Sequence, residues 1–148
     1  MPYWKRPRLS PRSARSTSRF CSIGGSPPTC SPLPGQIQIA ADFAKGTTAR
    51  LAGAEVPSYA DDEASFAALR QRIAKTVSFV QTFKPADIDG SETGTSRSSC
   101  AAEEVRFKGQ PYLLHFALPN FYFHAATAYD LLRACGLGIG KRDFLGQI

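Results

Sequence analysis

Both histidines of this 148-residue chain fall in one stretch, from Gln110 to Gly136. One of them, His124, follows Asn120 by four residues, a spacing that places two side chains one turn apart on the same face of a helix. A neutral imidazole can ligate a divalent metal or accept a hydrogen bond, and an amide offers both a donor and an acceptor. Asn120 and His124 are therefore the residues whose types and spacing best suit chemistry.

Two further residues stand out by their surroundings. His115 lies between two apolar residues, where we expect a strand to lead into a helix, and a structural role suits it best. Asp42 is a carboxylate on a largely apolar helix, and a buried acid needs a partner. For His124 we weigh a ligand-binding role against a simpler one, in which Asp42 or Tyr129 satisfies the imidazole inside the protein.

The helix that carries Asn120 and His124 is predicted by its ends and by its period. Pro119 suits the first turn, where a missing N–H costs nothing, and Gly136 suits the position just past the end. Apolar residues recur between them at intervals of three and four, which predicts a helix over 119–135 with one face to bury. These apolar positions are Phe121, Ala125, Ala128, Leu132 and Cys135.

Two earlier segments show the same helical period. The first helix is predicted over residues 36–52, with Gly53 as its stop. The second follows the acids at 61–63, which suit a helix N-terminus, and ends before Pro85. Its apolar positions are Phe66, Leu69, Ile73, Val77 and Val80. The cations on its other faces are expected to form a solvated surface; they are Arg70, Arg72 and Lys75.

A short strand is predicted between the second and the last of these helices. Residues 104–109 alternate polar and apolar side chains, and Gly109 ends the pattern. A strand needs a partner, and the preceding residues 93–102, rich in Ser and Thr, are a poor one. The glycine-rich tail after Gly136 lacks a preceding strand and a following helix, so we do not expect a phosphate loop there.

Composition narrows the class of protein. The chain is 43% hydrophobic, enough for one modest core, and no run approaches the roughly 18 apolar residues of a membrane span. Its start is basic without an apolar stretch, unlike a secretory signal, so we expect a cytoplasmic protein. The four cysteines lack Cys-x-x-Cys spacing, which favours neither a zinc set nor a disulfide framework.

The net charge of +6 comes from one end of the chain. Residues 1–34 carry six basic side chains and no acid, whereas residues 35–148 carry twelve of each sign. Residues 1–34 also hold several prolines and many serines without any hydrophobic period, so as printed they are expected to be disordered. A basic segment of this kind can be an arm that binds nucleic acid.

Three stretches resemble an uncharacterised bacterial family. They read QIQIAADFAKG (36–46), GQPYLLHFALPNFYFH (109–124) and GKRDFL (140–145). Through them, residues 33–92 and 103–146 resemble DUF1993, a domain of unknown function in the DinB/YfiT-like superfamily. The resemblance implies an all-α fold, an antiparallel four-helix bundle with a small β-hairpin before the last helix. Members begin with a long amphipathic helix and a segment like RLAPDMFP. Residues 1–32 show neither, so an intact first helix is expected to be lacking.

A shifted reading frame explains the two stretches that break the resemblance. Met1 to Lys5 must be encoded as ATG-CCN-TAY-TGG-AAR, and reading from the third nucleotide gives Ala, then Ile, Leu or Val, then Leu, then Glu. The same shift applied to Gly25 through Pro32 permits RLAPDMFP, and applied to residues 93–101 it yields a strand-like pattern. Our hypothesis is that residues 1–33 and 93–102 are out of frame, within a truncated helical domain over 34–148. The arginines before residue 34 would then be products of the wrong reading frame, so they do not indicate a nucleic-acid partner, and none is expected.

The resemblance also implies where a metal site would lie. Many relatives in the superfamily resemble metal-binding bundles, with a histidine from the second helix and a His-x-x-x-His pair on the last. The matching pair here is Asn120 and His124, and the earlier helix offers Gln38 and Asp42 in place of a histidine. This ligand set is incomplete, so His124 is only a weak candidate metal ligand. A divalent metal remains one alternative, and the resemblance establishes no cofactor.

The function expected from the sequence is the binding of a small ligand by an interior polar cluster. The first alternative is a degenerate metal-dependent enzyme of the thiol-linked transferase or hydrolase type. The second is a purely structural or dimerising module, because a bundle without its first helix exposes apolar faces that favour a homodimer. The catalytic residues are unknown. The candidate ligand-binding residues are Asp42, Asn120, His124, His115, Gln38 and Tyr129.

Overall fold

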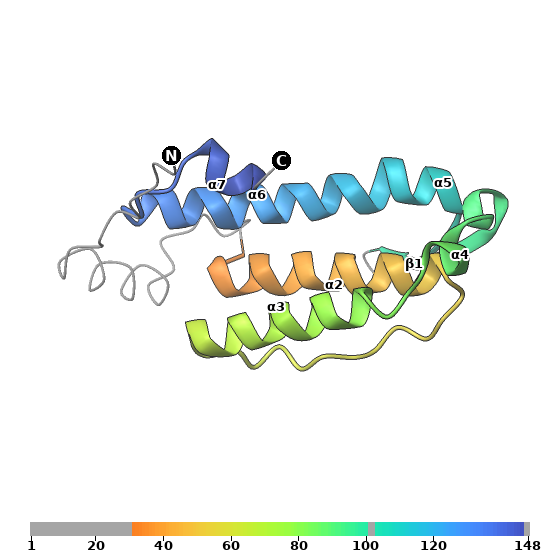
Figure 1. Ribbon diagram of the computed structural model, residues 1–148, viewed down its shortest axis with the longest axis horizontal. Coiled ribbons are helices and arrows are strands. Elements are labelled where there is room, and N and C mark those ends of the chain that lie inside the picture. Colours follow the sequence, from red (N-terminus) through yellow and green to blue (C-terminus); the bar gives the residue numbers. More distant parts are fainter. Residues whose placement is uncertain (1–30, 101–102, 147–148) are drawn as a thin grey trace, which may run out of the picture.

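The computed structural model describes residues 31–100 and 103–146 of the chain (Figure 1). The segment expected to be out of frame at the start lies, up to residue 30, outside the described residues. Three long helices form the body: α2 (Leu33–Leu51), α3 (Phe66–Val80) and α6 (Leu118–Ala134). In Figure 1, α2 lies between the other two helices. It therefore contacts both α3 and α6 over much of its length.

The predicted ends of α2 agree with the structure to within a few residues. The helix begins one turn earlier than expected, because prolines at 32 and 34 fit the N-cap and the first turn. It ends at Leu51, and Gly53 follows with a φ of 68°, a left-handed conformation that glycine adopts without steric cost.

Helices α2 and α3 run in the same direction, while α6 runs opposite to both. Residues 52–65 make this possible by crossing back along the bundle before α3 begins (Figure 1). The hydrogen bond from Gln38 to Glu63 holds the end of this crossover beside the first half of α2. The pairing of Gln36 with His124, and of Phe43 with Phe116, fixes the opposite direction of α6. The parallel run of α2 and α3 therefore corrects the antiparallel order expected from the sequence, which holds only for α6 against the other two helices.

Helix α3 begins with a capping residue that the sequence reading passed over. The hydroxyl of Ser65 accepts a hydrogen bond from the backbone N–H of Ala68, at 3.1 Å. A serine in this position satisfies one of the N–H groups that a helix start leaves without a partner. The acids at 61–63 were expected to serve that end of the helix. Two of them, Asp61 and Glu63, instead pair with the side chain of Arg72.

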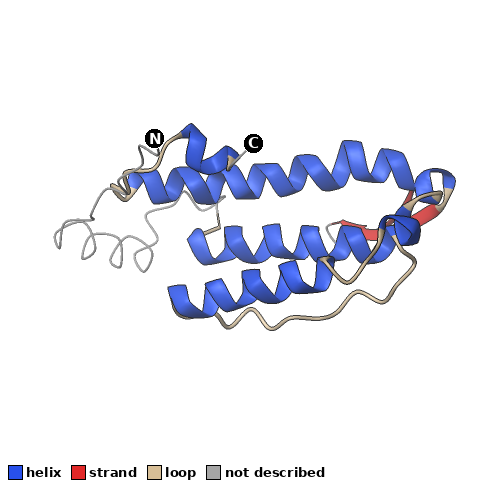
Figure 2. Ribbon diagram, viewed as in Figure 1, coloured by secondary structure: helices blue, strands red, loops and turns tan. Residues whose placement is uncertain are grey.

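A two-stranded antiparallel sheet follows α3, after the short α4 (Pro85–Ile88) and η1 (Ser91–Thr93). Strand β1 (Thr95–Cys100) pairs with β2 (Glu103–Lys108), with Thr95 opposite Lys108 (Figure 2). The expectation that residues 93–102 make a poor partner is therefore wrong for the backbone. A ladder needs backbone donors and acceptors in register, and Ser and Thr supply these as well as apolar residues do.

The last helical segment begins earlier than the sequence predicted. It starts with α5 (Gly109–Pro111), continues as a π-helical turn, η2 (Tyr112–Ala117), and passes into α6. His115 therefore lies within the π-helical turn and not at a strand-to-helix junction. Pro119 still falls in the first turn of α6, as expected. The short α7 (Lys141–Leu145) follows α6.

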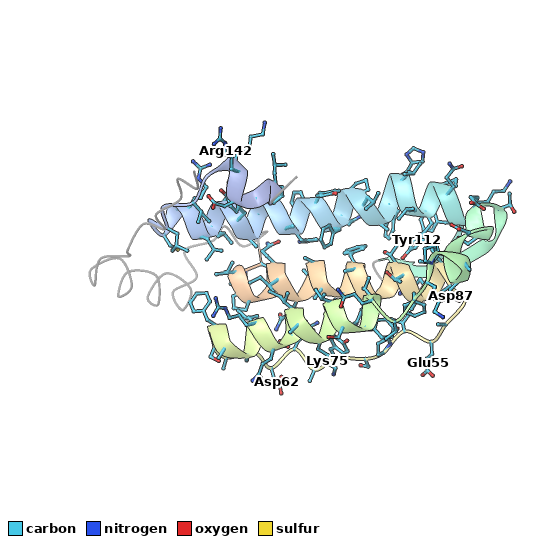
Figure 3. The ribbon with its side chains drawn as sticks, viewed as in Figure 1. Glu55, Asp62, Lys75, Asp87, Tyr112 and Arg142 are labelled. Atoms are coloured by element: carbon cyan, nitrogen blue, oxygen red, sulfur yellow. The ribbon has the colours of Figure 1, made fainter. Side chains whose placement is uncertain are left out.

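The buried apolar residues lie mainly along α2 and the α5–α6 segment and become few on α3. Tyr112 is fully buried, and its hydroxyl accepts a hydrogen bond from Arg50 on α2 (Figure 3). On α3, by contrast, Leu69 is buried but Ile73 and Val77 of the same apolar stripe are nearly half exposed. The predicted uncovered apolar face is thus present.

Within the described part of the chain, no helix is long and apolar enough to cross a membrane.

Candidate functional site

The best-defined polar site joins the start of α2 to the middle of α6. Nδ1 of His124 lies 2.7 Å from Oε1 of Gln36. The amide nitrogen of Gln36 donates to the backbone carbonyl of Ser31, at 2.9 Å. Gln36 is only 2% exposed, whereas His124 is half-buried and Ser31 is exposed, so these contacts lead from the interior of the bundle to its surface.

These two hydrogen bonds determine the protonation of the imidazole. Because the amide nitrogen of Gln36 faces the carbonyl of Ser31, its oxygen faces His124 and can only accept. Nδ1 of a neutral His124 must then carry the proton, which leaves the lone pair on Nε2. No hydrogen bond to Nε2 occurs within the described residues. Nε2 of His124 is therefore an oriented hydrogen-bond acceptor, and no described side chain donates to it.

The surroundings keep this imidazole neutral. Burial lowers the pKa of His124 below its ordinary value of 6.5. One face of the ring stacks on Phe43 of α2, with 6.2 Å between the ring centroids and 17° between the planes. Phe123 meets the ring edge to face, at 5.2 Å. At neutral pH the group is accordingly an uncharged acceptor held between aromatic side chains.

Asn120 lies one turn before His124 on α6, as its spacing predicted. Its amide nitrogen donates to the backbone carbonyl of Phe116, at 2.7 Å. This contact uses the amide as a donor, and so leaves its oxygen as a second acceptor on the same side of the helix as His124. The two residues thus share one side of α6, and each offers an acceptor.

Asp42 belongs to a different cluster, between α2, α3 and the crossover. Its carboxylate lies 2.8 Å from Arg72 on α3 and 2.8 Å from Lys45 on its own helix. The predicted bond from His124 to Asp42 is therefore absent among the described contacts, since Gln36 takes that place. The partners that this carboxylate needs are thus two cations, Lys45 and Arg72.

Arg72 is the centre of this second cluster and corrects the sequence reading. It was expected to lie on a solvated surface, yet it is only 3% exposed. Its guanidinium contacts Asp42, Asp61 and Glu63 at 2.8 to 3.0 Å. It also donates to the backbone carbonyl of Ala60, at 3.0 Å. The crossover covers α3 here, and a helical period alone does not contain that information.

Charge and burial oppose one another in the Arg72 cluster. Burial alone would raise the pKa of Glu63, but hydrogen bonds from Gln38 and Arg72 outweigh it and the pKa falls below 4.5. Burial likewise disfavours the charged form of Arg72, but the hydrogen bond to Glu63 and the nearby acids raise its pKa overall. The aromatic ring of Tyr59 lies against three cations, at 4.0 to 5.5 Å from its centroid; they are Lys75, Lys45 and Arg72. The ion pairs of Arg72 with Asp42, Asp61 and Glu63, called the ionic joint below, therefore hold the crossover against α2 and α3.

The remaining predicted residues fall outside the His124 site. Gln38 donates to Glu63, at 2.7 Å, and so belongs with Arg72. The ring of Tyr129 meets Phe144 of α7, and its buried hydroxyl has no partner among the described residues. His115 is exposed on the π-helical turn. The six candidates are thus spread over several places: Gln38 and Asp42 belong to the Arg72 cluster, and Asn120 and His124 lie one turn apart on α6.

Gln36 is the site residue that the sequence reading missed. The sequence did contain one sign of its position: Gln36 precedes Phe43 by seven residues, so the two side chains share a face of the helix. Phe43 is the aromatic residue that stacks on His124. The sequence could not supply the register in which α2 and α6 lie side by side.

The comparisons with known proteins place this helical bundle in a family. Residues 28–145 match the family described as "Domain of unknown function (DUF1993)", and the chain belongs to that family. It is also similar to a solved structure, that of a DinB family member protein from Shewanella denitrificans. The TM-score is 0.77 and the sequence identity 32%, and the match covers 93% of this chain and 82% of that one. No curated protein matches the chain. The DinB-like helical bundle expected from the sequence is confirmed.

The residues at the site do not fit the metal centre that the superfamily resemblance implies. A catalytic zinc ion takes three protein ligands, chiefly imidazoles, thiolates and carboxylates. Here one imidazole meets the amide of Gln36, whose oxygen already accepts from His124, and the amide of Asn120 bonds the carbonyl of Phe116. Among residues 31–100 and 103–146, no group of three His, Cys, Asp or Glu side chains is placed to hold a metal ion. No chemical step is therefore assigned to a metal.

Proposed function

We propose that this protein binds a small ligand that donates hydrogen bonds, at the α2–α6 site of Gln36, Asn120 and His124. The observation that carries the proposal is the chain of contacts from Ser31 through Gln36 to His124. That chain leaves Nε2 of His124 as an oriented, neutral acceptor in a half-buried place. Nε2 of His124 is not one of the buried atoms without a partner in the described part of the chain, so water can reach it and a ligand donor would replace that water.

The chemical class of the ligand follows from the groups that face it. Nε2 of His124 and the oxygen of Asn120 both accept, so a hydroxyl, amine or amide donor suits them. Phe43 supplies an apolar wall, which favours a ligand with a compact apolar body. A carboxylate or phosphate is disfavoured, because it would bring its own acceptors against these two.

The proposal is tested by thermal melting of the protein with a panel of small alcohols, amines and amides, with EDTA present. We expect at least one class of donor to raise the midpoint temperature. The His124→Ala variant should lose this shift, whereas the control His115→Ala, which changes the exposed histidine, should keep it. A shift that both variants keep, or no shift with any donor, would refute the proposal.

The same variants separate the proposal from a degenerate metal enzyme. Tight binding of one divalent metal per chain, lost in His124→Ala and kept in His115→Ala, would favour the enzyme and overturn the binding role. We expect neither zinc nor manganese to remain on the protein after dialysis against a weak chelator.

A further inference from the structure

A pocket of about 360 Å³ lies where α2 ends, against α4 and η1. The carbonyl end of α2, residues 50–53, lines one part of it, and residues between 87 and 94 line the rest. Asp87 and Tyr112, the hydrogen-bond partner of Arg50, lie at this same end of the bundle (Figure 3). The pocket shares no residue with the α2–α6 site, so it is a second place for a small molecule.

Arg50 lines this pocket as a half-buried cation whose described partner is neutral. Its guanidinium donates to the hydroxyl of Tyr112, at 3.2 Å, and forms no ion pair within the described residues. A guanidinium has five N–H donors in a planar fork that matches the two oxygens of a carboxylate. Most donors of Arg50 are therefore left for water or for a ligand.

Two aspartates line the pocket from α4 and its end. Asp89 forms no side-chain hydrogen bond or ion pair in the part of the chain that the structure describes. Asp87 uses one oxygen to accept from the backbone N–H of Lys84, at 2.7 Å. The carbonyl end of α2 adds partial negative charge to the same pocket. This part of the pocket therefore attracts a cation such as an ammonium group.

Charges of both signs thus line one pocket without neutralising each other. Among residues 31–100 and 103–146, no ion pair joins Arg50 to either aspartate. A simple anion bound to Arg50 would be repelled by the two carboxylates, and a simple cation bound to the carboxylates would be repelled by the guanidinium. A molecule with one group of each sign avoids both repulsions.

We infer that this pocket binds a small zwitterion of the amino-acid class. Its carboxylate lies against Arg50, and its ammonium lies against Asp89 and the carbonyl end of α2. The apolar residues Leu51 and Ile88 also line the pocket, which suits the carbon chain that joins the two charged groups.

Titration calorimetry of the full chain with β-alanine, γ-aminobutyrate and the common α-amino acids tests the pocket. We expect at least one of them to bind more tightly than propionate and propylamine, each of which carries only one of the two charges. Arg50→Met should weaken that binding about tenfold, the usual effect of losing a hydrogen bond to a charged group. Asp89→Asn should weaken it about threefold, because Asp89 is exposed and exposed ion pairs contribute less.

The variants separate binding from folding. Asp89→Asn changes an exposed side chain without a described partner, so it should fold even if Arg50→Met, which also loses the bond to Tyr112, does not. The control Glu55→Gln removes an exposed acid outside the pocket and should bind like the wild-type protein, as should His124→Ala. The inference is overturned if no zwitterion binds, if propionate or propylamine binds as tightly, or if Asp89→Asn leaves the affinity unchanged.

Discussion

Replacing Arg72 with methionine tests whether the ionic joint between α3 and the crossover stabilises the fold. Methionine keeps the length and apolar stem of the side chain but removes the guanidinium and its contacts with three acids. The acids differ in how easily water can replace that partner. The side chains of Asp42 and Asp61 are 43% and 60% exposed, whereas that of Glu63 is 10% exposed.

The expected magnitude follows from this difference. Exposed ion pairs contribute about 0 to 1 kcal/mol, so the loss at Asp42 and Asp61 is small. Leaving one partner of a buried pair behind costs about 3 to 5 kcal/mol, and Glu63 retains its second donor, Gln38. We therefore expect Arg72→Met to lower the free energy of unfolding by about 3 kcal/mol.

Urea unfolding followed by circular dichroism measures this loss, at one fixed protein concentration because association shifts apparent stability. Arg70→Met is the matched control, since Arg70 is exposed on the same helix. A loss for Arg72→Met as small as that of the control would refute the reasoning. The cluster would then be the solvated surface that the sequence suggested.

The same joint predicts a pH dependence. Because the folded pKa of Glu63 lies below its ordinary value of 4.5, its contribution to stability is present above pH 4.5. That contribution disappears as the pH falls through the lower, folded pKa. The wild-type protein should therefore lose stability below pH 4.5 more steeply than Arg72→Met, in which the hydrogen bond that lowers this pKa is gone.

Three further predictions follow from single sites. Since burial lowers the pKa of His124, its contribution to stability is complete above pH 6.5 and falls as the pH drops below that value. In His124→Ala, the thermal midpoint should therefore depend less on pH between pH 5 and 7 than in the wild-type protein. Tyr129→Phe removes a buried hydroxyl without a described partner, so urea unfolding should show no loss of stability, and a loss above about 1 kcal/mol would contradict this account. Gly109→Ala would drive a methyl group into the backbone carbonyl of Ser91, so we expect a loss of about 2 kcal/mol in the same assay, and an unchanged midpoint would show that the turn adapts.

The sequence predicted the helices well because their signals are local. Apolar periods and the residues Pro119 and Gly53 fixed α2, α3 and α6 to within a few residues. The burial of Arg72 could not be predicted in this way, because it depends on where the crossover folds back. The partner of His124 is likewise 88 residues away, and its identity depends on the register between α2 and α6.

The reading-frame hypothesis stays a prediction, although it bears on the uncovered apolar face of α3. Strand β1 pairs with β2 as printed, so a sheet at this place does not require the other frame. Sequencing the coding DNA across the start, codons 32–35 and codons 92–103 decides the matter. We expect single-nucleotide changes that restore a helix-forming start, and an unaltered frame at all three places would disprove the hypothesis.

The central claim, that Gln36 orients His124 as a neutral acceptor, is tested most directly by the nitrogen-15 chemical shifts of the imidazole at pH 7.5. The account predicts a protonated Nδ1 and an unprotonated Nε2 in the wild-type protein. The Gln36→Leu variant, which removes the acceptor for Nδ1–H, should shift the population toward the other tautomer. A proton on Nε2 in the wild-type protein, or a doubly protonated ring, would contradict the claim.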